Sequence, residues 1–399
     1  MEDCYIINAQ RSPRGIGKPT GSLYRITAVN LLAQLLDAVT TPDLSHEIEE
    51  VITGCVMPVG EQGANIARSA ILCSRLPIHV PGMQINRFCS SGLDAINLMA
   101  YKIMAGQANI AIASGVECMS RVPILADGGA LVADPRVAFR HNIIPQGISA
   151  DLIATYFQYS RTQLDSFALS SQQKAKNAMA KKLFKSITPI VNILGNVVLE
   201  EDEHPRPDTT LEALADLKPS FAMMGALAGY DDVACYQYPA VEKIQHRHHA
   251  GNSSGIVDGA AAVLLASRHA IKKHQLQPLA RIVSTGQVGI DPTIMLTGPI
   301  EAIQQTLKRA KLTIEDIDLW EINEAFAAVV LRITDQLSIP LKRVNVNGGA
   351  IAFGHPLGAT GTMLMGTLID ELHRKKKRYG CVVLCTAAGM ASCTIIERV

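Results

Sequence analysis

The chain has 399 residues, of which 48% are hydrophobic and 18% charged, a balance typical of a folded globular protein. A net charge of +1 gives no long-range field that would favour nucleic acid or a membrane surface. No apolar run reaches the roughly 20 residues that a membrane-spanning helix needs. The nine cysteines are irregularly spaced without a Cys-x-x-Cys pair or a secretory leader, so we expect reduced thiols in a cytoplasmic protein.

The first part of the chain alternates strands with helices. We expect strands at residues 5–8, 50–55, 83–88 and 109–114, and helices at residues 27–39, 63–73 and 91–105. Continuous apolar strands between helices, such as residues 110–113, are typical of a parallel sheet covered on both faces. The sequence therefore predicts an α/β fold.

The same order of elements returns later in the chain. We expect strands at residues 280–284, 317–321, 343–347 and 381–386, and helices at residues 299–309, 324–337 and 359–376. Residues 259–267 and 392–397 match as final strands of the two series. This correspondence predicts a duplicated α/β unit, with residues 1–119 plus 249–270 as the N-terminal half and residues 271–399 as the C-terminal half.

Residues 120–248 interrupt the first copy. They contain a segment rich in charge and proline at residues 200–208. They also contain one clear helix, which begins at a capping box formed by Ser160 and Gln163. A long and mostly irregular excursion from a regular core is often functional, so we expect a lid or a cofactor-holding domain. An oligomerisation arm is the alternative, and one segment can serve both purposes.

Cys89 lies where an expected strand turns into an expected helix. The unpaired N–H groups and the positive dipole end of a helix N-terminus stabilise a thiolate. Small neighbours, Ser90, Ser91 and Gly92, leave room for a substrate to approach the sulfur. The alternative is a buried cysteine that serves only packing.

Three further groups follow expected strands of the second copy, at the edge where active sites of parallel sheets lie. Asn323 comes after residues 317–321, where a helix N-cap is the alternative. His355 is the one ionisable side chain within a run of five glycines, and a Cys with a His can form an activated pair. A phosphate-binding glycine loop is disfavoured because neither standard glycine pattern is present. Cys385 leaves the last central strand and could move a proton to or from carbon, or be a buried cysteine.

These four positions resemble the active site of the thiolase family, and the similarity runs along essentially the whole chain. Five motifs carry the resemblance: NRFCSSG at 86–92, GVECMS at 115–120, AGNSSGIVDGA at 250–260, NEAFA at 323–327 and GGAIAFGHPLGATG at 348–361. The resemblance implies duplicated thiolase-type α/β units packed as a layered α/β/α/β/α core, with residues 120–248 as an inserted loop domain for CoA binding and oligomerisation.

Thiolases interconvert a 3-ketoacyl-CoA plus CoA with a shortened acyl-CoA plus acetyl-CoA. By resemblance, Cys89 is the nucleophile that carries the acyl group as a thioester. His355 would accept its proton and, with a water held by Asn323, bind the first oxyanion. Cys385 would protonate the acetyl-CoA enolate in thiolysis or remove the α-proton in condensation. The backbone N–H groups of Cys89 and Ala387 would form the second oxyanion hole.

The resemblance also implies residues that bind coenzyme A. Ser254 would lie beside the pantetheine arm, Lys218 near the adenine, and Met119 in the same binding site. An ordinary surface lysine is the alternative for Lys218. Coenzyme A is expected as a substrate, with no tightly bound cofactor and no metal. The histidines at positions 246, 248 and 249 are interpreted as a loop that leads into the glycine motif, because no fitting metal partner is spaced near them.

Some departures from the family pattern bear on the substrate. Ala387 and Ala388 replace two of three glycines that usually follow the second cysteine. Ile124 stands where acetoacetyl-specialised members have a histidine, and the segment between Phe221 and Gly251 is long for that subgroup. We therefore expect a degradative enzyme of fatty acid β-oxidation that takes longer or bulkier 3-ketoacyl chains.

Other functions stay open at this point. One alternative is an acetyl-CoA acetyltransferase that mainly forms acetoacetyl-CoA. A condensing synthase of the same fold would lack Cys385, and a non-catalytic CoA- or lipid-binding homologue would lack Cys89 or His355. For partners, we expect a homodimer or homotetramer, with a β-oxidation hydratase/dehydrogenase subunit as a further candidate, and neither nucleic acid nor a membrane span.

Overall fold

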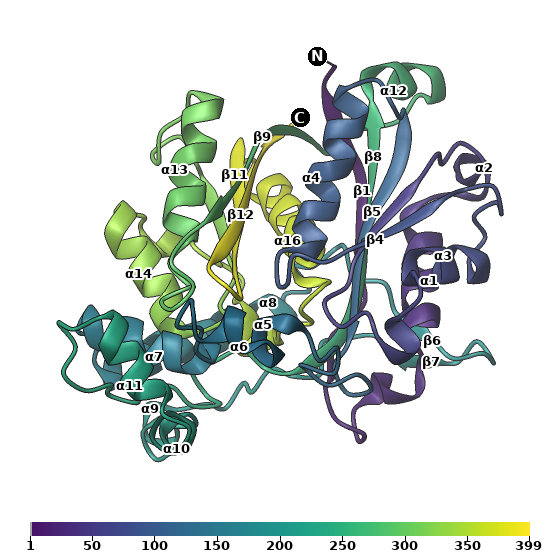
Figure 1. Ribbon diagram of the computed structural model, residues 1–399. Helices are drawn as coiled ribbons and strands as arrows, with labels where there is room; N and C mark the ends of the chain where they lie inside the picture. The colour runs from purple at the N-terminus through teal and green to yellow at the C-terminus, as the bar shows by residue number, and fades with distance from the viewer. Residues whose placement is uncertain (1) are drawn as a thin grey trace.

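A single ten-stranded mixed sheet organises the computed structural model, which describes residues 2–399 (Figure 1). The strands of its first half are β1 (Cys4–Arg11), β2 (Gly15–Ile16), β3 (Val51–Gly54), β4 (Gly82–Ile85), β5 (Ile110–Cys118) and β8 (Val257–Ser267). Those of its second half are β9 (Ala280–Gly289), β10 (Leu319–Ile322), β11 (Tyr379–Thr386) and β12 (Met390–Arg398). The strand order is β10-β11-β12-β9-β1-β8-β5-β3-β4, with β2 beside β8.

The expectation of a parallel sheet is wrong for much of this sheet. Only β3 with β4, β3 with β5, and β10 with β11 pair in parallel. β8 and β12 run antiparallel to both of their main neighbours. The chain turns from β11 to β12 within residues 387–389, and so short a connection can join only antiparallel strands.

The two halves of the sheet meet at one corner. β1 and β9 are paired at two positions only, Tyr5 with Arg281 and Ile6 with Ala280. On either side of this joint the strands follow the same order, because β3, β5 and β8 correspond to β10, β11 and β12. The two halves therefore form separate walls that share one edge.

A strand expected at residues 343–347 is absent from the described residues, and only an isolated bridge between Val344 and Trp320 stands in its place. The reason lies in Asn345, whose backbone has a left-handed φ of 43°. Its side chain bonds both backbone groups of Ile322, accepting from the N–H at 2.9 Å and donating to the carbonyl at 2.8 Å. A side-chain amide thus completes the edge of β10 where the first copy uses the backbone of β4.

Helices form three layers around the two walls (Figure 1). α1 (Ala28–Val39) and α3 (Ile66–Cys73) cover the outside of the first half. α13 (Pro299–Ala310) and α14 (Ala327–Leu337) cover the outside of the second half. α4 (Ser91–Met104) and α16 (Thr360–Lys375) lie between the walls and share one buried cluster with strands of both halves. The order of layers is α/β/α/β/α.

The two central helices touch through their backbones. A Cβ placed on Gly361 of α16 would lie 2.4 Å from the backbone nitrogen of Leu93 in α4. No side chain fits in that space, so glycine is required there for the close approach. Through this contact the first turn of α4 and the first turn of α16 are held side by side.

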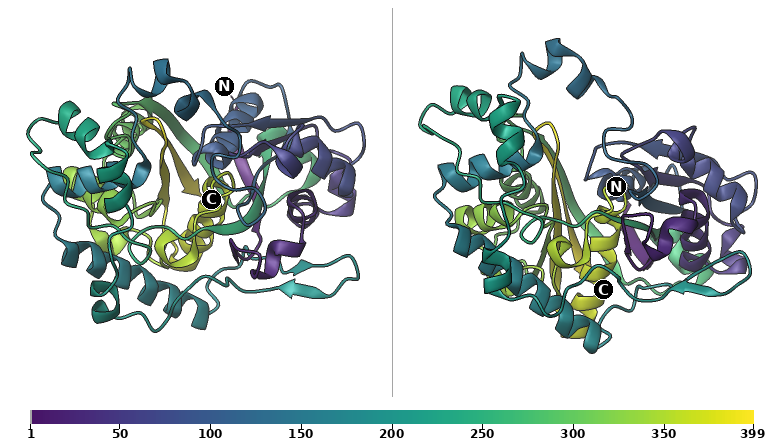
Figure 2. Two further views of the ribbon diagram at one scale, coloured as in Figure 1. Left: turned by 60° about the horizontal axis from the view of Figure 1, so that its bottom comes forward. Right: turned by 90° about the horizontal axis from the view of Figure 1, so that it is seen from below.

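The insertion gathers around one end of the sheet (Figure 2). Its elements are α5 (Ala130–Ala133), α6 (Pro135–Ala138), α7 (Gln146–Tyr156), α8 (Arg161–Ala180), α9 (Leu211–Ala215), α10 (Ala222–Leu227), α11 (Tyr230–Gln237) and the hairpin of β6 (Ile190–Val191) with β7 (Val197–Leu199). α8 begins with the predicted capping box of Ser160 and Gln163.

The expectation of a single clear helix in the insertion is wrong. α7 was missed because eight consecutive residues, 147–154, are buried, and a helix buried on all sides has no polar face to reveal its period. α2 (Pro42–Ser45), α12 (Arg268–His274) and α15 (Ala350–Phe353) complete the α-helices of the core. Among residues 2–399, no helix combines the length and the apolar character that crossing a membrane requires.

Candidate active site

Cys89 lies just before α4, in a turn where Phe88 has a left-handed φ of 47°. Its side chain is buried in a small apolar cluster made by Val56, Met57, Cys89, Met119, Val122 and Leu357. Burial raises the pKa of the Cys89 thiol to about 12, and the charge of Glu117 adds to this effect. The N–H groups of Cys89 and Ala387 and the side chain of Gln146 act in the opposite direction on the same pKa. The expected helix-end stabilisation is therefore outweighed by burial, and the resting group is a neutral thiol.

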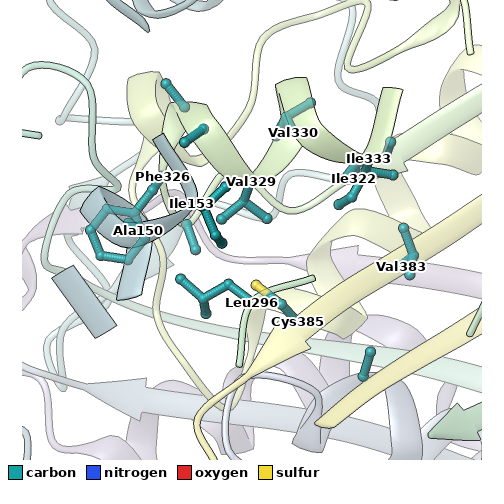
Figure 3. Close-up of a cluster of buried hydrophobic side chains, with 14 of the residues drawn as sticks. Ala150, Ile153, Leu296, Ile322, Phe326, Val329, Val330, Ile333, Val383 and Cys385 are labelled. Atoms are coloured by element: carbon teal, nitrogen blue, oxygen red, sulfur yellow. The ribbon is translucent and has the colours of Figure 1, made fainter. Parts of the chain in front are cut away.

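Cys385, the penultimate residue of β11, lies close to Cys89. Burial raises the pKa of Cys385, and the neighbouring Cys89 raises it further. The reason is that a negative charge on one sulfur disfavours a negative charge on the other. The start of α4 is tied to the same strand because the hydroxyl of Ser90 donates to the carbonyl of Leu384 at 3.4 Å. In Figure 3, Cys385 lies beside Leu296, with Ala150 and Ile153 of α7 packed over it. Two thiols from different copies of the unit thus share one buried site.

His355 is a buried neutral base. Burial lowers the pKa of its imidazole to about 3, and the positive charge of Arg14 contributes. Its Nδ1 lies 2.6 Å from the hydroxyl of Thr360, and that hydroxyl donates to the carbonyl of Pro356 at 3.1 Å. Since the hydroxyl proton is used, Thr360 accepts from Nδ1–H, and the lone pair of the imidazole is on Nε2. Nε2 is therefore the atom that can accept a proton.

Asn323 faces that nitrogen from the end of β10. Its Nδ2 lies 3.3 Å from His355 Nε2, and its backbone N–H donates to the carbonyl of Val383 at 3.0 Å. No group within residues 2–399 donates to its buried Oδ1, which is thus available to a water or a substrate. The alternative that Asn323 is a helix N-cap is wrong, because Phe326 occupies the N-cap position of α14.

The loop that carries His355 presses against the first copy of the unit. Leu357, two residues later, belongs to the cluster around Cys89. The carbonyl of Gly358 would lie 2.3 Å from a Cβ on Gly115 and 2.6 Å from a Cβ on Gly92. Backbone contact at two glycines therefore joins the histidine loop to β5 and to the first turn of α4.

The turn that carries Ala387 accommodates the two alanines that stand where glycines were expected. Ala388 adopts a left-handed φ of 59° and Gly389 one of 71°, so the turn places one alanine where L-residues carry strain. The hydroxyl of Thr386 donates to the carbonyls of Ala387 and Met390 at 2.9 and 3.3 Å. The N–H of Ala387 is left directed at Cys89.

The three residues expected to bind coenzyme A lie in different surroundings. Met119 is part of the buried cluster around Cys89, whereas Lys218 is exposed. Ser254 is half-buried, and its backbone N–H donates to the carbonyl of Ala325 at 2.9 Å. An open groove of about 370 Å³ is lined by residues that are close in sequence to Ser254 and Lys218. It is lined by Gln172, His204, Arg206, Pro207, Asp208, Thr209, Ala213, Leu214, Leu217, Ala250, Gly251 and Ile351.

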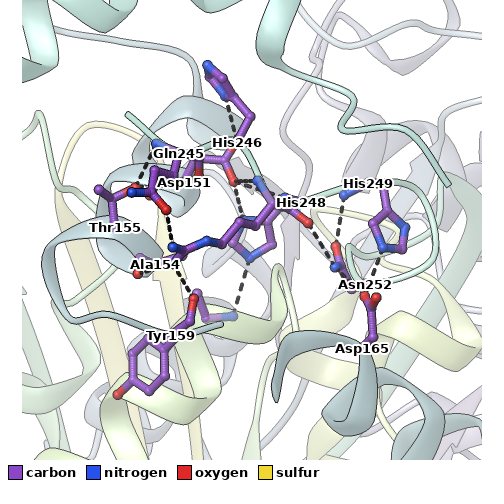
Figure 4. Close-up of polar contacts among 12 residues, drawn as sticks. Asp151, Ala154, Thr155, Tyr159, Asp165, Gln245, His246, His248, His249 and Asn252 are labelled. Carbon is purple, nitrogen blue, oxygen red and sulfur yellow. Dashed lines mark hydrogen bonds and ion pairs between the residues drawn. The ribbon is translucent and has the colours of Figure 1, made fainter. Parts of the chain in front are cut away.

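The histidines of residues 246–249 are each paired with an aspartate of the insertion (Figure 4). His246 bridges Asp151 and Asp231, with both nitrogen–oxygen distances 2.9 Å. His248 lies 2.7 Å from Asp151, and His249 lies 2.8 Å from Asp165. Within residues 2–399 there is no group of three or more side chains arranged to hold a metal ion. The network instead fastens α7, α8 and α11 to the glycine motif that follows.

Sequence reasoning missed several polar neighbours of the site. Thr360 could have been found, since it follows His355 by five residues at the start of an expected helix. Glu117 stands within the 115–120 motif as its one charged residue. Gln146 opens α7, a helix without a visible period, and Arg14 is distant in sequence, so neither gave a signal.

Comparisons with known proteins agree along the whole chain. Residues 4–231 match the family described as thiolase, N-terminal domain, and residues 276–398 match thiolase, C-terminal domain. A β-ketoadipyl-CoA thiolase of Pseudomonas aeruginosa is 38% identical, with 100% of this chain and 99% of that protein covered. A 3-ketoacyl-CoA thiolase of Bacillus subtilis is 36% identical, with 100% of both covered. The crystal structure of human mitochondrial 3-ketoacyl-CoA thiolase in complex with CoA superposes with a TM-score of 0.85 at 32% identity, covering 100% of this chain and 98% of that one.

Proposed function

Because this chain belongs to the thiolase family and is an acyltransferase, we propose that it cleaves a 3-ketoacyl-CoA with CoA. The products are acetyl-CoA and an acyl-CoA shortened by the acetyl unit, and the reverse reaction is a Claisen condensation. The observation that carries this proposal is the pair of neighbouring thiols, Cys89 and Cys385. One thiol can form a thioester while the other moves a proton at carbon.

In the first step, the sulfur of Cys89 bonds to the 3-keto carbon while its proton passes to Nε2 of His355. The resting pair is neutral, because the pKa of Cys89 is about 12 and that of His355 about 3. Proton transfer must therefore accompany attack on the substrate. The carbon–carbon bond then breaks, its electrons form the acetyl-CoA enolate, and the thiol of Cys385 protonates that enolate at carbon.

In the second step, the thiol of CoA attacks the thioester on Cys89. The acyl group leaves as acyl-CoA, the thiolate of Cys385 takes the proton of the CoA thiol, and the sulfur of Cys89 regains its proton from His355. A sulfur nucleophile suits this exchange because the enzyme thioester and the CoA thioester are of similar energy, so either direction can run. No metal takes part in this scheme.

Oxyanions form in both steps, and two sets of donors are suited to hold them. His355 Nε2 and a water on Asn323 would bind one oxyanion, and the N–H groups of Cys89 and Ala387 would bind the other. A preorganised donor in such a site contributes on the order of 3–4 kcal/mol to the transition state. The unpaired Oδ1 of Asn323 supports the proposal of a bound water at this point.

Coenzyme A would enter as a substrate and not as a tightly bound cofactor. We propose that Ser254 contacts the pantetheine arm, that Lys218 lies near the adenine, and that Met119 contributes to the binding site. The groove of about 370 Å³ is lined by Leu217 and Gly251, which are close in sequence to Lys218 and Ser254, and this supports the placement of those two residues. The CoA complex of the human mitochondrial 3-ketoacyl-CoA thiolase shows that a protein of this fold binds the same molecule.

Two classes of acyl chain are candidates for the preferred 3-ketoacyl-CoA substrate. Longer or bulkier 3-ketoacyl chains of β-oxidation agree with the name of the Bacillus subtilis relative. A chain that ends in a carboxylate agrees with the name β-ketoadipyl-CoA thiolase of the Pseudomonas aeruginosa relative. A main role in forming acetoacetyl-CoA is a weaker candidate, because Ile124 replaces the histidine of that subgroup.

The cellular setting is also a proposal. All nine cysteines are free, which supports a reducing compartment such as the cytoplasm. Homodimers and homotetramers are the proposed assemblies, with a β-oxidation hydratase/dehydrogenase subunit as a further partner.

The test is a chain-length series of 3-ketoacyl-CoAs with CoA, including 3-oxoadipyl-CoA, followed by loss of the magnesium-enolate absorbance. The C89A and H355A variants serve as controls, and both should be inactive. The preferred substrate is the one with the highest kcat/KM. Thiolysis that survives C89A would overturn the nucleophile assignment and with it the proposed reaction.

A further inference from the structure

Glu117, near the end of β5, has its carboxylate fully buried beneath the cluster that contains Cys89. Its Oε2 accepts the N–H of Val56 at 2.8 Å and the N–H of Gly358 at 2.9 Å. Its Oε1 accepts the N–H of Met57 at 3.2 Å and Nε2 of Gln62 at 2.8 Å. Four N–H donors, together with the thiol of Cys55 at 3.9 Å from Oε1, therefore surround one carboxylate that the reaction described above does not use.

The N–H donors around Glu117 favour its charged form, whereas burial disfavours that form. No lysine or arginine among residues 2–399 forms an ion pair with it. Burial raises the pKa of Glu117, and the N–H groups of Val56, Gln62, Met57 and Gly358 oppose that rise. A protonated carboxyl would direct its O–H at a group that is itself a donor, so the bonds are made only by the carboxylate.

The four donors come from both copies of the α/β unit. Val56 and Met57 follow β3 and pack directly on Cys89. Gly358 belongs to the loop of the second copy that carries His355. The approach is tight, since a Cβ on Gly358 would lie 2.9 Å from Oε2 of Glu117 and 2.8 Å from the carbonyl of Gly54. One carboxylate thus joins the segment beside the nucleophile to the segment that carries the base.

We propose that Glu117 is a positioning residue, whose carboxylate holds the loop of His355 in register with Cys89 for proton transfer. The inference rests on the proposed function, because it takes Cys89 as nucleophile and His355 as base. A misplacement of about 1 Å between reacting groups can lower a rate about 100-fold. The N–H of Gly358 bonds to this carboxylate at 2.9 Å, so loss of the carboxylate removes that tie on the loop.

The charge of Glu117 has a second effect. The charge of Glu117 on β5 acts on Cys89, Cys385 on β11 is the neighbouring thiol, and the charge of Arg14 acts on His355 in the loop before α16. The negative charge of Glu117 opposes a second negative charge on the Cys89 sulfur. The nucleophile is therefore kept as a thiol until the substrate and His355 take part.

The test uses E117Q, which keeps the volume but replaces one acceptor oxygen by an NH2 group. We expect kcat to fall about 100-fold with KM changed less than about threefold. Alkylation of Cys89 by iodoacetamide, read from the Cys89 peptide by mass spectrometry, should shift to lower pH, because the opposing charge is gone. Because general loss of structure would also expose the buried thiol and ease its alkylation, the shift counts only where the circular dichroism spectrum and melting temperature of E117Q match those of D370N.

D370N is the matched control. Asp370 on α16 is a half-buried carboxylate that accepts the N–H groups of Lys185 and Ser186 at 2.9 and 3.0 Å, outside the site. This variant should lose stability without moving the alkylation profile. A kcat of E117Q equal to that of D370N, or an unmoved alkylation profile, would overturn the proposal.

E117D provides a second variant if E117Q does not fold. It keeps the charge and shortens the reach, so kcat should fall while the alkylation profile stays in place, and full activity would overturn the proposal. C89A and H355A in the same assays separate the two levels of inference. If they remain active, the proposed function fails; if they are inactive and E117Q is active, only the role of Glu117 fails.

Discussion

Replacing Thr360 by valine removes one hydroxyl from behind the imidazole that we propose as the base and keeps the shape of the side chain. Thr360 is fully buried at the start of α16, and its Oγ1 lies 2.6 Å from Nδ1 of His355. In the T360V variant Nδ1–H has no acceptor at that position. The imidazole can avoid this by moving its proton to Nε2, which then no longer accepts a proton from Cys89.

The size of the effect follows from the burial of the bond. A buried donor left without a partner costs about 1–3 kcal/mol. Because each 1.4 kcal/mol is about a factor of ten in rate, kcat should fall roughly 5- to 150-fold. KM should change little, since Thr360 is buried behind the imidazole and not in the groove. T360S, which restores the hydroxyl, should recover most of the activity.

The assay is thiolysis of acetoacetyl-CoA or of the preferred 3-ketoacyl-CoA, with kcat and KM measured separately. T367V is the matched control, because Thr367 is buried on the same helix and its hydroxyl donates to the carbonyl of Met363 at 3.2 Å. It tests the loss of a helix-internal hydroxyl without touching the imidazole. A kcat for T360V within about twofold of that for T367V would refute the assigned tautomer and the role of Nε2 as base.

Three further outcomes are expected. The C385A variant should still release CoA from acetyl-CoA in a single burst, but its steady turnover should be about 10²–10⁴-fold slower than that of the wild type. Steady condensation at the wild-type rate would contradict the role of Cys385 as acid and base. The hydrogen bond with Asp151 raises the pKa of His246, so its stabilisation is full below about pH 6.5 and is lost as pH rises through the folded pKa. H246Q should therefore lower the free energy of unfolding, measured by urea titration, by on the order of 1 kcal/mol at pH 6 and by less at pH 9. An equal loss at both pH values would exclude a charged imidazole at His246. G361A should destabilise by about 1–3 kcal/mol or more by forcing α4 and α16 apart, whereas G289A, with open space at its Cβ, should melt like the wild type.

The sequence predicted most of the core elements because their hydrophobic periods are strong. α1, α4, α13 and α16 begin and end within a few residues of the expected positions. The direction of the strands was not predictable in this way, because buried strands read alike in parallel and antiparallel pairs. The strand expected near Asn345 could not be excluded from the sequence, because the side-chain amide of Asn345 makes the hydrogen bonds to Ile322 that a strand backbone would otherwise make.

The reactive groups of the site were visible in the sequence, and their electrostatics were not. Cys89 was expected to be favoured as a thiolate by the helix end, but burial and Glu117 raise its pKa to about 12. Burial depends on Val56, Met57 and Leu357, which come from distant segments. The partner of His355 is likewise set by the way the helix starts, which brings Thr360 under Nδ1. Such effects belong to packing and not to motifs.

The single corner at which β1 meets β9 has a consequence for how the molecule assembles. Two paired positions cannot hold two walls together, so their union depends on α4 and α16, whose apolar faces are buried in one shared cluster. Either half synthesised alone would leave its central helix uncovered and prone to aggregate. The duplicated units must therefore fold and unfold cooperatively, and separately expressed halves should gain order only when mixed.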